Sequence, residues 1–134
     1  MNRLKELVGR MGATTMPADS ESINKLENAL DFNLSDEYKK YLSEFGVIVY
    51  RSYETYGLGV PDDYYLNVLV IHKDLKNDKY YPLGVLPLME IGDGSYYLYE
   101  MESEKILLWA SPNGGVIKEV SRGLEAFLVD NIFE

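Results

Sequence analysis

The sequence predicts an α+β fold, with a largely antiparallel central sheet and helices at both ends of the chain packed on it. Apolar residues recur at helical spacing over residues 1–45 and again over residues 121–134. Between these regions, β-branched and aromatic runs alternate with Gly-rich turns. Strands that follow one another through short turns pair antiparallel, so we do not expect alternating strand–helix–strand units.

Three helices are expected in the N-terminal third of the chain. Gly12 ends the first, Asp19 or Ser20 caps the second, and Ser35 caps the third, which Gly46 ends. The residues that form the apolar stripes of these helices are Leu4, Leu7, Val8 and Met11; Ile23, Leu26, Ala29 and Leu30; and Tyr38, Tyr41, Leu42 and Phe45.

The middle of the chain has the composition of strands. The expected strands cover residues 47–50, 53–58, 86–91, 96–101, 105–109 and 116–120. Asp93-Gly94, at the centre of the turn 92–95, favours a tight hairpin because that turn needs positive φ. The turn 112–115 joins the last two strands, and Ser121 is expected to cap a final helix with the apolar stripe Leu124, Phe127, Leu128 and Ile132.

Residues 66–75 fit two structures. Val68 to Ile71 has the composition of a buried strand, whereas Leu66, Leu69, Val70 and Lys73 fit one face of a helix. Periodicity alone leaves both alternatives open.

Length and composition restrict the protein class. The 134 residues suit a single domain, residues 1–134, and the absence of cysteine excludes disulfides and thiolate metal sites. The net charge of −9 disfavours nucleic-acid binding. Without a signal-like or membrane-spanning apolar run, we expect a cytoplasmic protein with no membrane contact.

The sequence lacks the residue sets of common active sites. His72 is the single histidine, so neither a zinc cluster nor a well-supported catalytic triad is expected. Gly57-x-Gly59 lacks the remaining glycine of a dinucleotide loop. We therefore predict no catalytic residues, no metal and no cofactor, and we keep a carboxylate-based hydrolase as the less favoured alternative.

Tyrosines and unneutralised acids suggest a binding surface instead. The chain contains 12 tyrosines, a residue type enriched at protein interfaces, and two acidic stretches contain no Lys or Arg. Trp109 ends an apolar run and is expected to be a core anchor. The predicted partner-binding residues are Tyr53, Glu54, Tyr56, Asp62, Asp63, Tyr64, Tyr65, Glu100, Glu102 and Glu104.

The order of these signals resembles the SUKH superfamily. The residues that carry the resemblance are Ile23-x-x-Leu26-Glu27-x-x-Leu30, the run from Leu34 to Leu42, Phe45-Gly46, and the run from Pro87 to Tyr97. Departures are Ser35, Val47 and Glu100, where the superfamily usually has Pro, Gly and Asp. The resemblance implies that residues 66–75 form a helix packed on the sheet.

The superfamily groups a fungal cell-wall-assembly regulator with bacterial immunity proteins that neutralise toxins. The resemblance therefore implies a non-catalytic module that binds a protein. Acidity adds that the partner is a basic toxin domain. The alternative is a regulatory scaffold subunit of a larger assembly.

Overall fold

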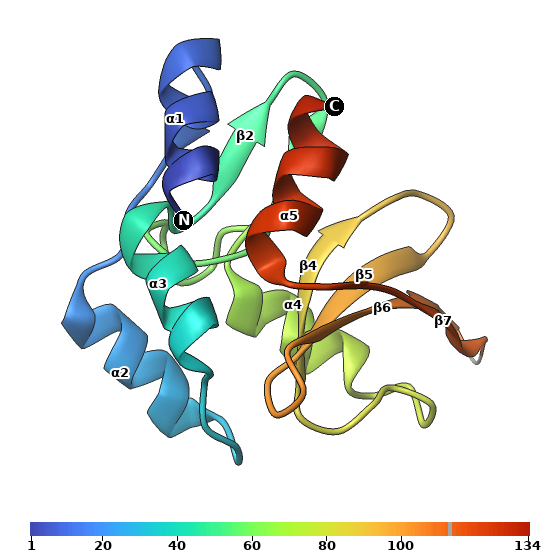
Figure 1. The fold of residues 1–134 in the computed structure, drawn as a ribbon. Helices are drawn as coiled ribbons and strands as arrows, with labels where there is room; N and C mark the ends of the chain where they lie inside the picture. The colour runs from blue at the N-terminus through green and yellow to red at the C-terminus, as the bar shows by residue number, and fades with distance from the viewer. Residues whose placement is uncertain (113) are drawn as a thin grey trace.

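The structure, a computed structural model, describes residues 1–112 and 114–134 and confirms the α+β class. The described strands form a three-stranded and a four-stranded antiparallel sheet with helices around them (Figure 1). In the larger sheet the order is β4-β5-β6-β7, so each strand pairs with its sequence neighbour. These strands are β4 (Val85–Glu90), β5 (Ser95–Glu100), β6 (Lys105–Ala110) and β7 (Gly115–Arg122).

The three N-terminal helices form where the caps and stripes predict them. They are α1 (Asn2–Met11), α2 (Ser20–Ala29) and α3 (Asp36–Glu44). The Asp19 side chain accepts from the Ser22 N–H, and the Ser35 hydroxyl accepts from the Tyr38 N–H, so both helices have side-chain N-caps. Gly12 ends α1 in the left-handed conformation, with a φ of 71°.

The β4–β5 hairpin confirms the Asp-Gly signal. Asp93 and Gly94 have φ values of 54° and 77°, as a two-residue turn between twisted strands requires. The smaller sheet contains β1 (Thr14–Thr15), β2 (Ile48–Tyr50) and β3 (Tyr53–Glu54), so the strand expected over 53–58 is only two residues long. In the expected turn 112–115, Asn113 lies outside the described residues.

Residues 66–75 resolve to the helical alternative. The helix α4 is Val68–Leu75, and the Asn67 side chain caps it by accepting from the Leu69 N–H. The backbone groups of Gly57 help to fix its start, because the Val68 N–H donates to the Gly57 carbonyl at 2.9 Å.

The prediction that Ser121 caps the last helix is wrong. The backbone of Ser121 belongs to β7, and its side chain lies outside the described residues. The helix α5 (Leu124–Leu128) begins instead after Gly123, whose φ of 109° turns the strand directly into the helix. A π-helical turn, Val129–Phe133, continues it to the C-terminus.

Helices and loops cover part of each face of the larger sheet, whereas Val116, Ile117 and Val120 of the edge strand β7 are exposed. On one face Tyr97 packs edge-on against Phe127 of α5, and Tyr99 stacks on Tyr38 of α3. On the other face Trp109 packs against Tyr81, beside α4. Tyr38, Tyr99 and Trp109 are fully buried, which confirms the predicted core role of Trp109.

Close backbone contacts anchor the segment between β3 and α4. A side chain at Gly57 would place its Cβ 1.6 Å from the Gly46 carbonyl oxygen, and one at Gly46 would meet the Met16 carbonyl oxygen at 1.8 Å. Only glycine permits both approaches. As a result, residues 57–59 lie between the chain at Met16 and the start of α4, and these contacts hold the chain in place where the loop 61–66 begins.

No helix among the described residues is long and apolar enough to cross a membrane.

Candidate functional site

Exposed aromatic and acidic side chains gather where β3, the loop 61–66 and the end of β4 meet. Three tyrosines here are exposed, Tyr53 at 42%, Tyr64 at 40% and Tyr65 at 55%, whereas several others, such as Tyr38, Tyr41 and Tyr99, are fully buried. Such a grouping of tyrosines is typical of interfaces. We refer to Tyr53, Glu54, Tyr64, Tyr65, Glu90 and Ile91 together as the acidic–aromatic face.

Side-chain contacts tie the loop to β3. The Tyr65 hydroxyl donates to the Glu54 carboxylate, and this bond raises the pKa of Tyr65. The rings of Tyr64 and Tyr65 lie 4.7 Å apart between centroids. The loop tyrosines are therefore partly ordered before any partner arrives, which lowers the entropy that binding must overcome.

A cleft of about 340 Å³ opens in the acidic–aromatic face. Tyr53 and Glu54 of β3 line it on one side, and Glu90 and Ile91 line it with Tyr97. Asn131 also contributes; its amide N–H₂ donates to the Phe127 carbonyl at 2.8 Å. The lining includes no Lys or Arg, so a ligand group that only donates hydrogen bonds, such as a guanidinium, matches its acceptors.

Carboxylates of this region lie near the hydroxyls of two buried tyrosines, Tyr56 and Tyr96. Burial raises the pKa of Tyr56, and nearby Glu90 and Glu54 raise it further. Burial also raises the pKa of Tyr96, with Glu90 and Asp74 adding to the effect. Glu90 adds to both pKa shifts, so its negative charge lies near both hydroxyls.

The structure places the predicted binding residues in three regions. Tyr53, Glu54, Tyr64 and Tyr65 lie together in the acidic–aromatic face. Tyr56, two residues after Glu54, is only 7% exposed, and its backbone N–H donates to the carbonyl of Leu88 in β4. Its side chain therefore offers little surface to a partner, although Glu90 and Glu54 of the face lie near it.

Asp62 and Asp63 lie at the tip of the loop, and both are exposed. The sequence stretch around them contains no base, but α2 supplies one: Lys25 Nζ lies 3.5 Å from the Asp62 carboxylate. The pair is highly exposed, so it contributes at most about 1 kcal/mol to stability.

Glu100, Glu102 and Glu104 lie at the far end of the β4–β5 hairpin. Glu90 pairs with Tyr96, and Glu100 is four residues farther along β5, roughly 14 Å away at about 3.4 Å per residue. Glu102 and Glu104 are exposed, as the sequence predicts, and Glu100 accepts a hydrogen bond from the Ser103 hydroxyl. Glu100, Glu102 and Glu104 thus lie on a surface separate from the acidic–aromatic face.

Glu90 and Ile91 are members of the acidic–aromatic face that were absent from the predicted set. The Asp93-Gly94 turn alone does not place them, because a two-residue turn there would pair Glu90 with Tyr97, whereas the structure pairs Glu90 with Tyr96. Ile91 lies at the rim of the face and is 46% exposed.

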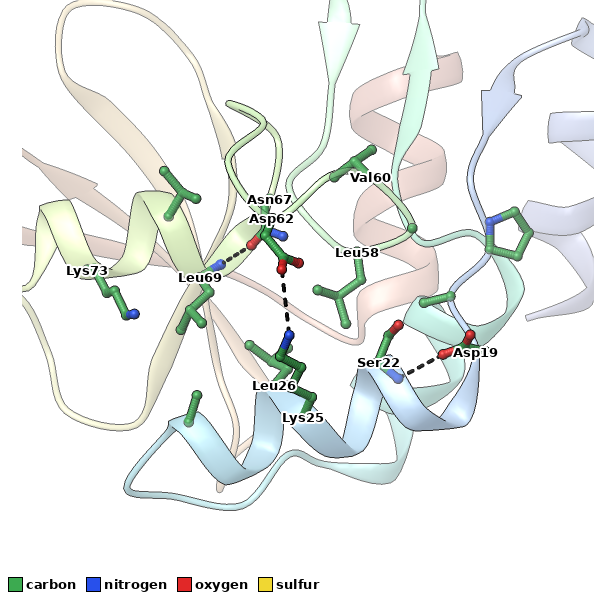
Figure 2. A pocket seen from close by; sticks show the side chains of 15 residues that line it. Asp19, Ser22, Lys25, Leu26, Leu58, Val60, Asp62, Asn67, Leu69 and Lys73 are labelled. Atoms are coloured by element: carbon green, nitrogen blue, oxygen red, sulfur yellow. Dashed lines mark hydrogen bonds and ion pairs between the residues drawn. The ribbon is translucent and has the colours of Figure 1, made fainter.

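A second cleft, of about 610 Å³, separates α2 from α4 (Figure 2). Leu26, Leu58 and Leu69 line it with apolar surface, and the Lys25–Asp62 ion pair spans its opening. Lys73 of α4 points toward the same space. Asp19 also lines the cleft, but its carboxylate caps α2, which lowers its pKa.

His72 is buried beside Tyr81. It is 7% exposed, and its Nδ1 lies 2.9 Å from the Tyr81 hydroxyl. Burial lowers the pKa of His72. Among residues 1–112 and 114–134, no group of three or more His, Cys, Asp or Glu side chains is arranged to hold a metal ion.

A solved structure and a protein-family model both match this chain. A crystal structure of a protein from Pseudomonas syringae pv. tomato superposes with a TM-score of 0.79 at 18% sequence identity, covering 97% of this chain and 96% of that chain. This likeness shows the fold. No curated protein matches the sequence. A family model described as SMI1-KNR4 cell-wall, SUKH_5, matches residues 1–134. The chain therefore belongs to the SUKH (SMI1-KNR4) family.

Proposed function

We propose that the protein is a cytoplasmic immunity module that binds and neutralises a basic toxin domain without catalysis. The observation that carries the proposal is the acidic–aromatic face, which combines exposed tyrosines with carboxylates that form no ion pair among the described residues. Family membership supports an immunity or regulatory role. A toxin whose own substrate is anionic, such as a nuclease, presents the complementary positive surface.

In the acidic–aromatic face, the carboxylates would speed association with the partner and the tyrosines would hold the complex together. Glu54 and Glu90 attract the basic partner over distance, an effect that raises the association rate and weakens with salt. Tyr65 and Tyr53 offer apolar area with a polar tip, the chemistry of interface hot spots. The regulatory alternative uses the same surface for a constitutive cellular partner.

The test is co-expression with a candidate toxin domain, if the neighbouring gene encodes one, followed by binding kinetics. Replacing Glu54 and Glu90 by Lys should lower the association rate constant by about tenfold or more at low salt. The matched control replaces Glu102 and Glu104 by Lys, which changes the net charge equally at the other end of the hairpin and should change the rate much less.

Tyr65→Ala should mainly raise the dissociation rate, by the equivalent of about 2 kcal/mol. Tyr80→Ala is its control, since Tyr80 is 49% exposed and lies outside the face. A complex that forms without rescuing growth would favour the regulatory alternative. Absence of any complex at every ionic strength would refute the immunity role.

A further inference from the structure

The cleft between α2 and α4 lies outside the acidic–aromatic face and has a different character. Leu26, Leu58 and Leu69 give it apolar walls, and Val70 beside them is 39% exposed. On α4, Leu69, Val70 and Lys73 lie on one helical face that lines the cleft, and Leu69 also packs against the edge of the core. Figure 2 shows the space between this face and α2.

The charges around the cleft differ from those of the whole chain. The lining contains two lysines, Lys25 and Lys73, and two aspartates, Asp19 and Asp62, which sum to zero in a protein of net charge −9. Asp19 is committed to capping α2. Among the described residues Lys73 forms no ion pair, so this rim presents an ammonium group that lacks a counter-charge.

Asp62 shows that an anion fits at the opening. Its carboxylate projects from the loop to within 3.5 Å of Lys25 Nζ (Figure 2). Both side chains are mostly exposed, at 77% and 90%, so the pair is weak and can exchange for another anion. A ligand's anionic group placed there would interact with Lys25 and with Lys73 from across the cleft.

We propose that this cleft binds an amphiphilic anion, a molecule with an apolar body and one carboxylate or sulfonate group. The apolar body packs on Leu26, Leu58 and Leu69, while the anionic group takes the place of the Asp62 carboxylate beside Lys25, in a cleft that Lys73 also lines. A volume of about 610 Å³ lies within the range of small-molecule sites. The inference does not depend on the proposed toxin partner.

The test is a fluorescence titration of the whole protein with 8-anilinonaphthalene-1-sulfonate, followed by displacement with decanoate. We expect an enhanced, blue-shifted emission that decanoate reverses. Lys25→Gln with Lys73→Gln should weaken binding by about tenfold, since two charge contacts are lost. Asp62→Asn should strengthen it by about threefold, because the internal competitor is removed.

Controls distinguish binding of the probe in this cleft from nonspecific binding elsewhere on the protein. Lys40→Gln, on the exposed side of α3, should leave the affinity unchanged. Urea titrations of each variant verify that the fold is intact. Three results would each overturn the proposal: no saturable binding, equal displacement by decanol and decanoate, or an affinity insensitive to the Lys25, Lys73 and Asp62 substitutions.

Discussion

Removing the hydroxyl of Tyr38 should stabilise the protein. Tyr38 is fully buried, and its hydroxyl has no hydrogen-bond partner among the described residues. Burial also raises its pKa well above the usual value, so the group stays neutral. A buried hydroxyl without a partner costs about 1–3 kcal/mol by mutational measures. Tyr38→Phe keeps the ring that stacks on Tyr99 and removes only this cost.

Tyr41 supplies the opposite case, three residues along the same helix. Its hydroxyl bonds to the Thr55 hydroxyl at 2.6 Å and donates to the Tyr56 carbonyl at 2.8 Å, all in buried surroundings. Tyr41→Phe leaves both groups short of a partner, so we expect a loss of about 2–3 kcal/mol. Tyr38→Phe should gain about 1–2 kcal/mol.

Urea unfolding followed by Trp109 fluorescence measures both effects. With a slope near 1.5 kcal/mol per molar urea, the midpoint should rise by roughly 1 M for Tyr38→Phe and fall by more for Tyr41→Phe. The slope itself should not change. A Tyr38→Phe midpoint lower than that of the unmodified protein by 0.5 M or more would show that the hydroxyl is hydrogen-bonded and that the reasoning fails.

Three further predictions follow from burial and close contact. Burial lowers the pKa of His72 below 6.5 in the folded protein. Its contribution to stability is therefore present above pH 6.5 and is lost as the pH falls toward the folded-state pKa. The difference in urea midpoint between the unmodified protein and His72→Gln should narrow over that range. Gly57→Ala should lower the free energy of unfolding by about 3 kcal/mol or more, because its Cβ would lie 1.6 Å from the Gly46 carbonyl oxygen. Gly9→Ala is the control: a Cβ there would meet no atom within 4 Å beyond its own helix backbone and chain neighbours, so urea titrations should show a gain of about 0.5–1 kcal/mol. Trp109 is fully buried, and its indole N–H donates to the Tyr80 carbonyl, so native emission should be blue-shifted; emission at the wavelength of exposed tryptophan would contradict the packing.

The sequence predicted the elements whose signals are local. Side-chain caps at Asp19 and Ser35, the glycine after α1 and the Asp-Gly hairpin all depend on residues within one turn of one another. The start of α5 depends on tertiary structure instead, since β7 continues through Ser121 for as long as β6 provides a partner strand. A good capping residue cannot begin a helix while its backbone is paired in a sheet.

The candidate site was predictable only in part, for the same reason. Tyr53, Glu54, Tyr64 and Tyr65 are close in the chain, and the fold keeps them close in space. Glu90 joins them through the sheet, and Lys25 reaches Asp62 from a helix more than thirty residues earlier, so neither contact has a local signal. For the second cleft a signal did exist: the face of Leu69, Val70 and Lys73 mixes apolar residues with a charge, which is unusual for a fully covered helix face.

The loop 61–66 separates two surfaces with opposite preferences for charge, and Asp62 lies where they meet. For a basic protein partner its carboxylate adds to the negative field, so Asp62→Asn should slow association slightly. For an amphiphilic anion in the cleft the same carboxylate competes for Lys25, so Asp62→Asn should strengthen binding. One substitution therefore has opposite signs in two assays, and a general loss of structure could not produce that result, because unfolding would weaken both.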